Sequence, residues 1–481
     1  MKTFAITTLG CKVNQYEGRQ ICELLERFGL QQVPPAAKPD LVVVNSCCVT
    51  HIASAKCRNY INRARKLSPR TCVVVRGCLP TAQTGELDKI DNGVHLIGHR
   101  RHLPAELAQI IFNAAKHPAQ PGSAEPAANQ DDPANKPVNA HKIKNKNDLS
   151  DGLAAIKSFG GQTRAFLKVQ DGCDGFCTYC IVPKIRTEIY TKPLEQVLAE
   201  AKNLVASGHK EIVVTGIFLG AYGRDTVRRK NWQKLDINPL ADLLDKLAQV
   251  QGLCRLRLSS LEPADVTDEL LDVLVRHKEV IAPHLHLPLQ SGSDAVLKRM
   301  RRQYTVSAFR KTVEKVKSRL DRPAITTDIL VGFPGETDDD FNQTVAFAKE
   351  VAFSKMHVFP FSPRKGTAAV KLPGRLASQI VKERAKLLSD LDKKMQEKFR
   401  CRFLGETVNV LVESTAKIPH GRSERYFLVN LDQKNCAPGD FVAVKLTPDA
   451  LAANTTEPAE LRLVTPNACE ESAESTREAA P

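Results

Sequence analysis

The sequence predicts an α/β protein in three parts, which are an N-terminal doubly wound α/β domain, a partial (β/α)6 barrel and a small antiparallel β-barrel. Up to about residue 112, short apolar runs alternate with segments of helical period, and this alternation resumes from Arg164 to about Lys371. The last part instead carries short strand-like runs separated by Pro, Gly and Asn.

In the first part, the predicted strands are the apolar runs at 4–8, 40–45, 71–76 and 94–97. Near-continuous Val and Leu runs suit strands that are buried on both faces of a parallel sheet. Between the first two runs, Ile21, Leu24, Leu25 and Phe28 recur at helical spacing. We therefore expect a small doubly wound domain over residues 1–114.

Residues 115–157 differ in composition, with many Pro, Ala, Asn and Lys residues and few large apolar ones. Such a segment cannot bury enough apolar surface to fold, so we expect a disordered linker. Its Lys142, Lys144 and Lys146 suit a solvated charge run better than contacts to RNA phosphates. The acidic end at 467–481 is expected to be a disordered tail.

The central part, 158–400, repeats strand and helix six times, which predicts a curved parallel sheet. The expected strands are 165–169, 211–215, 255–258, 284–287, 325–330 and 356–359, and the expected helices are 194–206, 239–250, 268–276, 306–320, 338–351 and 376–400. The predicted antiparallel barrel over 401–466 has strands at 407–412, 425–429, 441–446 and 460–464.

The chain is basic, since 69 Lys and Arg residues outnumber 54 Asp and Glu residues and leave a net charge of +15. A polyanionic partner such as nucleic acid is one explanation, and general solubility is the other. No signal-peptide core and no long apolar run occurs, so we expect a cytoplasmic protein with no membrane association. Its 14 cysteines then suit metal or redox ligands better than disulfides.

Three of these cysteines, Cys173, Cys177 and Cys180, form a Cys-x3-Cys-x2-Cys loop directly after the first predicted barrel strand. Three thiolates at this spacing can hold a [4Fe-4S] cluster whose fourth iron stays open, because the next cysteine is Cys254. The loop resembles the motif of radical S-adenosylmethionine (radical SAM) enzymes, in which the methionine moiety fills that position. A structural zinc site is the alternative, but no second pair of ligands is present to complete a tetrahedron.

Three further cysteines, Cys11, Cys47 and Cys78, each follow a predicted strand of the first domain. Ligands gather outside the carboxyl ends of parallel strands, so these thiols are expected to hold a second metal centre. Cys48 is an alternative to Cys47, and Cys57 is a weaker candidate inside a helix. The competing explanation is that some of them are ordinary buried thiols, which suits Cys22 and Cys72 well.

Taken together, these segments resemble the methylthiotransferase family over nearly the full chain apart from the linker and the tail. The similar stretches are 8–17, the cysteine loop, 255–263, 284–293, 327–336 and 359–367. The run 9–15 and the pattern Asn-x-Cys-x-Val-Thr at 45–50 resemble the branch that modifies N6-threonylcarbamoyladenosine at position 37 of tRNA. Ser46 and Cys48 depart from the usual Asn-Thr-Cys-Thr of the family.

The resemblance implies two [4Fe-4S] clusters, two uses of S-adenosylmethionine and a C-terminal TRAM domain that binds RNA. One S-adenosylmethionine methylates a sulfur carried on the Cys11, Cys47 and Cys78 cluster. The other is cleaved by one electron to a radical, which activates carbon 2 of the adenine for insertion of the methylthio group. Cofactor chemistry is needed because no acid or base can break this C–H bond. Tyr179, Gly216 and Gln290 are candidate contacts to S-adenosylmethionine.

The expected macromolecular partner is tRNA through its anticodon loop, with sulfur and electron donors that the sequence does not identify. Three basic groups are candidate phosphate contacts or, equally, ordinary solvated faces. They are Lys56, Arg58, Arg63, Arg65, Lys66 and Arg70 around one helix; Arg299, Arg301 and Arg302; and Arg422 with Arg425. The alternatives are methylthiolation of isopentenyladenosine or of a ribosomal-protein aspartate, and a non-catalytic iron–sulfur RNA-binding protein.

Overall fold

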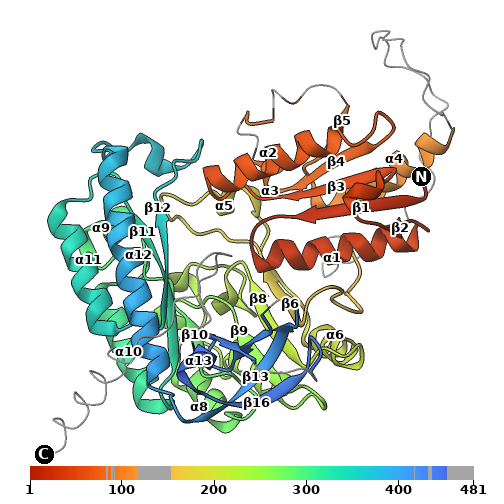
Figure 1. Ribbon diagram of the computed structural model, residues 1–481. Coiled ribbons are helices and arrows are strands. Elements are labelled where there is room, and N and C mark those ends of the chain that lie inside the picture. Colours follow the sequence, from red (N-terminus) through yellow and green to blue (C-terminus); the bar gives the residue numbers. More distant parts are fainter. Residues whose placement is uncertain are drawn as a thin grey trace, which may run out of the picture. The chain divides into compact units, whose positions relative to one another are not determined.

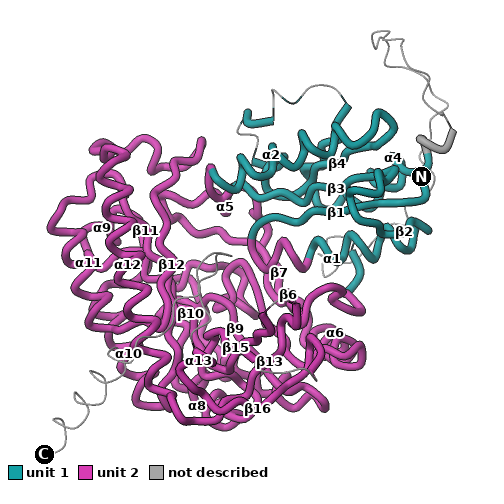
Figure 2. The backbone as a smooth tube through the Cα atoms, in the orientation of Figure 1, with its two compact units in different colours: residues 1–10, 17–48, 52–155 teal, residues 11–16, 49–51, 156–481 magenta. Residues whose placement is uncertain are grey.

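The computed structural model describes residues 1–82, 85–87, 90, 93–116, 153–416, 418–431 and 436–451, which form two compact units (Figure 2). The first unit comprises residues 1–10, 17–48 and 52–155, and the second comprises residues 11–16, 49–51 and 156–481. In the described ranges, no helix combines the length and the apolar character needed to cross a lipid bilayer.

The first unit is built on a parallel sheet in the order β2-β1-β3-β4-β5. Its strands are β1 (Thr3–Thr8), β2 (Gln31–Gln32), β3 (Leu41–Ser46), β4 (Cys72–Gly77) and β5 (Val94–Ile97). The helices are α1 (Lys12–Arg27), α2 (His51–Arg65), α3 (Cys78–Thr81) and α4 (Leu103–Lys116). After β1 the chain adds β2 at one edge of the sheet and then adds β3, β4 and β5 towards the other edge. This is the predicted doubly wound order.

Both faces of this sheet are covered by helices, as Val-rich strands require. Figure 1 shows α1 and α2 on opposite sides of the sheet. Leu25 of α1 and Leu107 of α4 belong to one hydrophobic cluster with Val43 and Val74, and α2 buries Cys57 and Ile61. The apolar stripe of Ile21, Leu24 and Leu25 that predicted a helix is therefore the buried face of α1.

The second unit begins with an open barrel of parallel strands. They are β6 (Arg164–Asp171), β8 (Glu211–Gly216), β9 (Arg255–Leu258), β10 (His284–His286), β11 (Ala324–Val331) and β12 (Lys355–Pro360). They form the sheets β7-β6-β8-β9 and β10-β11-β12, with the short antiparallel β7 (Tyr190–Thr191) at one edge. A parallel bridge from Ser260 to His286 joins the two sheets, so the six predicted strands follow one another in order.

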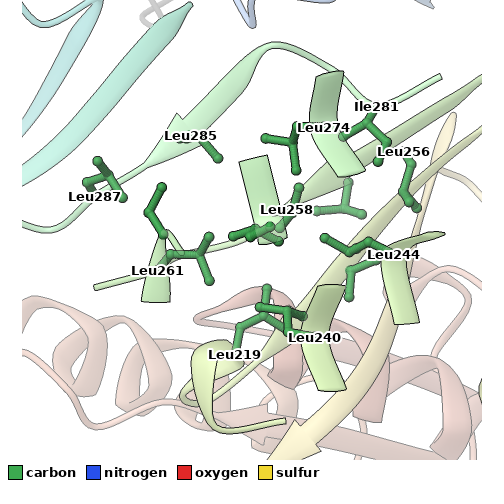
Figure 3. Packing of buried hydrophobic residues seen from close by; sticks show 14 of the residues in the cluster. Leu219, Leu240, Leu244, Leu256, Leu258, Leu261, Leu274, Ile281, Leu285 and Leu287 are labelled. Carbon is green, nitrogen blue, oxygen red and sulfur yellow. The ribbon is translucent and has the colours of Figure 1, made fainter. Parts of the chain in front are cut away.

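Helices pack around this barrel and bury its leucine-rich outer surface. They are α5 (Val182–Ile185), α6 (Leu194–Ala206), α7 (Pro239–Ala248), α8 (Asp268–Arg276), α9 (Asp294–Arg299), α10 (Val306–Arg319), α11 (Asp338–Val351) and α12 (Ser378–Cys401). Figure 3 shows Leu240 and Leu244 of α7 packed with Leu256 and Leu258 of β9. The predicted α/β class and the central barrel are confirmed.

The C-terminal sheet is antiparallel, in the order β15-β14-β13-β16. Its strands are β13 (Thr407–Ser414), β14 (His420–Ser423), β15 (Leu428–Asn430) and β16 (Phe441–Lys445), followed by α13 (Pro448–Leu451). Arg255, the first residue of β9, donates to the carbonyl oxygen of Asn409 at 2.6 Å, and Arg257 donates to that of Ser423 at 3.2 Å. The sheet therefore lies against the amino ends of the barrel strands, opposite the edge where the cysteine loop follows β6.

Three details differ from the sequence-based expectations. Helix α4 continues to Lys116, and Leu153 and Ile156 are buried, so both ends of the predicted 115–157 linker are structured. The strand predicted at 425–429 is β15, and β14 was not predicted. Residues 117–152 of the linker, the strand at 460–464 and the tail lie outside the described residues.

Candidate active site

The loop with Cys173, Cys177 and Cys180 leaves the carboxyl end of β6 through a turn that only glycine fits. Gly172 has φ +80°, and a Cβ atom there would lie 1.8 Å from the carbonyl oxygen of Glu188. The Cys173 amide then donates to the carbonyl oxygen of Arg186 at 2.9 Å. This turn fixes the start of the loop at the end of the barrel where (β/α) proteins place their sites.

The three thiols of this loop are close enough to affect one another electrostatically. Burial raises the pKa of Cys173 and of Cys180 to about 12, and the neighbouring Cys177 contributes to both increases. Iron must therefore displace protons that these thiols hold tightly. Irons of an iron–sulfur cluster bind thiolates, so these thiols must lose their protons when a cluster is bound.

A buried arginine network lies beside the loop. Arg302 donates from Nη1 to the sulfur of Cys177 at 3.2 Å and from Nη2 to Glu262 at 2.5 Å. Glu262 also accepts from Arg229 at 2.5 Å, and Arg229 pairs with Asp265 at 2.7 Å. Hydrogen bonds to cluster sulfurs tune the reduction potential, so the network is placed to affect cluster electronics.

No group of three His, Cys, Asp or Glu side chains in the described ranges is arranged tightly enough to hold one metal ion. A mononuclear zinc site at the cysteine loop would need such a group. A [4Fe-4S] cube distributes its thiolates over separate irons, so its ligands are farther apart. Cys173, Cys177 and Cys180 stay the predicted ligands of a [4Fe-4S] cluster.

The three residues predicted to contact S-adenosylmethionine have different surroundings in the structure. Gly216 ends β8 opposite Gln170, whose side chain would lie 2.9 Å from an added Cβ atom. Gln290 follows β10 with φ +67°, a conformation rare for a residue with a side chain. Tyr179 packs against the cluster that contains Met300 and Phe333. All three stay predictions as cofactor contacts.

The N-terminal cysteines follow three neighbouring strands. Cys47 comes directly after β3 and Cys78 directly after β4, with Ser46 and Gly77 in register. Cys11 comes three residues after β1, which pairs with β3 on its other side. Cys11 belongs to the second compact unit, whereas Cys47 and Cys78 belong to the first, so the convergence of the three positions stays a prediction.

The alternatives at this edge have structural roles. Cys48 is fully buried, and its sulfur donates to the carbonyl oxygen of Cys78 at 3.3 Å. Cys57 of α2 donates to the carbonyl oxygen of Cys47 at 3.3 Å, and burial raises its pKa. Cys47 stays the predicted ligand, and the hydrogen bond from Cys57 holds the backbone of Cys47.

A polar group on β10, β11 and β12 lies inside the barrel and was not predicted from the sequence. The Nε2 atom of His286 lies 3.3 Å from Asp328, and its Nδ1 atom lies 2.9 Å from the hydroxyl of Thr326. The ring of His357 lies 5.9 Å from that of His286. Alternate residues of a strand share one face, and this alternation places the group inside the barrel. The same alternation, read from the sequence, could have identified the group.

In two of the three predicted RNA-binding groups, arginines form ion pairs with acidic side chains, while Arg301 is exposed. The side chain of Arg302 is only 8% exposed and binds Glu262, and Arg299 pairs with Asp340 at 3.1 Å. Arg422 pairs with Glu413 at 2.8 Å, and Arg425 pairs with Asp321 at 3.0 Å. These four guanidinium groups already have acidic partners, which makes them less available to RNA phosphates than unpaired cations.

The group on α2 remains at the surface. Its exposed cations are Lys56, Arg63, Arg65, Lys66 and Arg70, and none of them forms an ion pair with a residue in the described ranges. Arg58 is the exception, since it pairs with Glu86 at 2.6 Å. The partly exposed ring of Tyr60 lies among these cations, with the guanidinium of Arg63 5.9 Å from its centre. Cations around an exposed aromatic ring suit single-stranded nucleic acid.

Comparisons with known proteins agree with this arrangement. Residues 167–348 match the Radical SAM superfamily, and residues 3–98 match the Uncharacterized protein family UPF0004. An open parallel barrel with a three-cysteine loop at its carboxyl end is accordingly that of a radical SAM enzyme, for which a [4Fe-4S] cluster and S-adenosylmethionine are the defining cofactors.

Similar proteins of known name identify the family to which the chain belongs within the radical SAM enzymes. The chain is 34% identical over 452 residues to threonylcarbamoyladenosine tRNA methylthiotransferase MtaB of Bacillus subtilis, covering 93% of this chain and 94% of the relative. It is 36% identical to the MtaB of Thermotoga maritima, covering 86% and 87%. The chain belongs to the methylthiotransferase family of radical SAM enzymes.

Two further proteins are similar to this chain, one with a different named substrate and one that shares the fold. The tRNA-2-methylthio-N(6)-dimethylallyladenosine synthase of Agrobacterium fabrum is 32% identical, covering 92% of this chain and 94% of the relative. A radical SAM methyltransferase, TsrM of Kitasatospora setae with cobalamin and a [4Fe-4S] cluster bound, superposes with a TM-score of 0.51 at 16% identity, covering 77% of each chain. This last similarity shows the shared fold alone.

Proposed function

We propose that this protein inserts a methylthio group at carbon 2 of N6-threonylcarbamoyladenosine at position 37 of tRNA. Relatives named for this activity align over most of the chain, and the two matching family models span both cysteine-bearing regions. The observation that carries the proposal is the presence of two separate cysteine groups, each beyond the carboxyl ends of parallel strands.

The loop cysteines Cys173, Cys177 and Cys180 would hold one cluster, and Cys11, Cys47 and Cys78 would hold the second. When bound, the first cluster supplies the electron for cleavage of S-adenosylmethionine, and the second presents the sulfur that is transferred. The chain itself supplies position and charge. Arg302 donates to the Cys177 sulfur, and Glu262 holds the guanidinium in that orientation.

The anticodon loop suits this site because its bases are already unpaired. Presenting such a base costs less than extracting one from a duplex. The exposed cations of α2 would contact the tRNA backbone, which positions the RNA without reading its sequence. A tRNA substrate is consistent with the cytoplasmic location expected from the sequence.

Mass spectrometry of tRNA nucleosides tests the proposal. A strain without this protein should lose the 2-methylthio derivative of N6-threonylcarbamoyladenosine and should regain it on complementation. Loss of the isopentenyl derivative instead would favour the activity that gives the Agrobacterium relative its name. Unchanged tRNA together with loss of a methylthiolated ribosomal-protein aspartate would favour the third substrate.

A non-catalytic iron–sulfur protein makes a different prediction. Reduced, fully loaded protein mixed with S-adenosylmethionine should release 5′-deoxyadenosine if it is a radical SAM enzyme. The absence of this product under strictly anaerobic conditions would contradict catalysis.

A further inference from the structure

The loop between β8 and α7, residues 217–238, lies beside the cysteine loop and was not among the predicted RNA-binding groups. Strands β6 and β8 are parallel neighbours, so the cysteine loop after β6 and the 217–238 loop leave the barrel at the same edge. In (β/α) proteins, loops at this edge carry the contacts to the substrate. The 217–238 loop is therefore placed where a substrate of the predicted cluster would enter.

Asp174 fixes this loop to the cysteine loop. Its carboxylate accepts from the hydroxyl of Thr226 at 2.7 Å and from the amide of Val227 at 2.9 Å. Its carbonyl oxygen accepts from Nε of Arg228 at 2.9 Å. The side chain of Val227 is fully buried. Because both backbone and side chains are held, residues 226–228 have one defined position against the cysteine loop.

An exposed aromatic ring and an exposed guanidinium meet at this junction. The ring of Phe176 is 40% exposed, and the guanidinium of Arg228 lies 5.6 Å from its centre. The side chain of Arg228 is 41% exposed and pairs with Asp174 at 3.3 Å. Aromatic rings and guanidinium planes are the two surfaces on which unpaired bases stack. Since these groups are already fixed, a base that stacks on them loses little binding energy to ordering the protein.

The rest of the 217–238 loop is basic around a fixed tryptophan. The indole of Trp232 donates to the carbonyl oxygen of Thr226 at 2.8 Å, and the guanidinium of Arg224 lies 4.9 Å from its ring centre. Lys230 and Lys234 are exposed. Neither these lysines nor Arg224 form an ion pair with an acid in the described part of the chain. Unpaired cations at a surface favour a polyanionic partner such as an RNA backbone.

We propose that Phe176 and Arg228 form a stacking platform for a nucleotide next to the target adenosine of tRNA, while Arg224, Lys230 and Lys234 contact phosphates of the same anticodon loop. Phe176 lies between two of the predicted cluster ligands, so a base stacked on it leaves its neighbour close to the cluster. The inference rests on the proposed function and deepens it, because it assigns an RNA surface to the barrel itself. These residues bind RNA and take no part in bond breaking.

The platform is tested with anticodon stem–loop RNAs that carry threonylcarbamoyladenosine at position 37. One RNA is intact, and two others lack the base of one of the two flanking nucleotides. Binding of each RNA to the fully loaded full chain is measured for wild type, Phe176→Leu and Phe176→Tyr. Iron analysis of each variant shows whether the cysteine loop still holds its cluster.

Loss of one flanking base should weaken binding to wild type about 5- to 150-fold, the range of base–aromatic stacking. Phe176→Leu should weaken binding of the intact RNA by a similar factor, and loss of that base should then have no further effect. Phe176→Tyr should behave like wild type, because it keeps the aromatic face. Normal binding of the intact RNA by Phe176→Leu would overturn the platform, as would an undiminished effect of the missing base in this variant.

The phosphate contacts are tested at exposed side chains, whose replacement leaves the cysteine loop intact. Changing Lys230 and Lys234 together to Gln should reduce the slope of log affinity against log salt by about 1.4 to 1.8. The matched control changes Lys202 and Lys311, which are exposed on the outer helices α6 and α10, and should leave the slope unchanged. Equal effects of the two double variants would overturn the assignment of phosphates to this loop.

Failure of the proposed function would be recognised separately. A wild type that binds the modified RNA but never methylthiolates it would refute the proposed function. The effect of Phe176→Leu on binding would still decide whether the stacking platform exists.

Discussion

The guanidinium of Arg302 lies 3.2 Å from the sulfur of Cys177 and donates a hydrogen bond to it. This relationship joins the cysteine loop after β6 to the segment after α9, 125 residues further along the chain. Glu262 holds the other end of the guanidinium, so the donor cannot turn away without leaving a buried carboxylate with one partner fewer.

Replacing Arg302 with Gln should slow S-adenosylmethionine cleavage while leaving the three cysteines in place. A lost hydrogen bond to a cluster sulfur makes the cluster harder to reduce, and changes of this kind cost about 10- to 100-fold in activity. Release of 5′-deoxyadenosine and the reduction potential should therefore both fall. Arg301→Gln is the control, because Arg301 is the exposed neighbour. Equal effects of the two variants would contradict a specific role for Arg302.

The two adjacent cysteines after β3 should differ in iron binding. Wild type should hold about eight irons per chain when fully loaded, and Cys47→Ala should hold about four. Cys48→Ala should keep about eight, because the Cys48 sulfur donates to the Cys78 carbonyl oxygen. Iron analysis after anaerobic reconstitution distinguishes them. The reverse result would make Cys48 the ligand.

Binding of tRNA should depend steeply on salt through the basic face of α2. Changing Lys56, Arg63 and Lys66 together to Gln should reduce the slope of log affinity against log salt by about 2 to 3, since each lost phosphate contact contributes about 0.7 to 0.9. Changing Arg299, Arg422 and Arg425 to Gln should leave the slope nearly unchanged in the fraction that folds, because these side chains are ion-paired. A flat salt dependence in wild type would exclude the electrostatic contribution.

An independent sign of RNA contact is expected at Tyr60. Its ring is 38% exposed on the same helix, and stacking of a base is worth about 1–3 kcal/mol. Tyr60→Ala should weaken binding of tRNA without changing the salt slope, whereas Tyr60→Phe should not weaken it. A change in the slope would assign Tyr60 a role in positioning the neighbouring cations instead.

The sequence predicted the parts whose signal is local. Strands such as β3 and β4 were found because their Val runs are buried on both faces, and the cysteine loop was found because its spacing is specific. Strand β14, with the sequence His-Gly-Arg-Ser, carries no such pattern. It forms because neighbouring strands and the arginines of β9 satisfy its backbone.

Partners that are distant along the chain could not be predicted. The sequence shows that Arg302 and Arg425 are basic, but not that Glu262 and Asp321 neutralise them. It also does not show that Asn14 accepts from Arg186 or that Tyr16 donates to Glu200, because these partners are more than 150 residues apart along the chain. Charge is a property of the sequence, whereas pairing is a property of the fold.

A tyrosine at the junction of the barrel and the C-terminal sheet predicts an unusual pH dependence of stability. Burial would raise the pKa of Tyr426, but Arg422 and Arg164 lower it to about 7. In the unfolded chain this pKa is about 10, so between pH 7 and 10 the folded state alone is ionised. The free energy of unfolding should thus gain a contribution as pH rises through this window, complete above about pH 10 and lost below about pH 7.

Tyr426→Phe should remove this contribution, so its stability relative to wild type should decrease progressively from pH 7 to 10 in urea unfolding. Tyrosinate absorbance near neutral pH should disappear in the same variant. Tyr222→Phe is the control, because burial raises the pKa of Tyr222 to about 12 and no ionisation occurs in this window. If wild type shows no tyrosinate below pH 9, the arginines do not stabilise the charged ring, and the role of Tyr426 is limited to stacking on His284 with centres 4.6 Å apart.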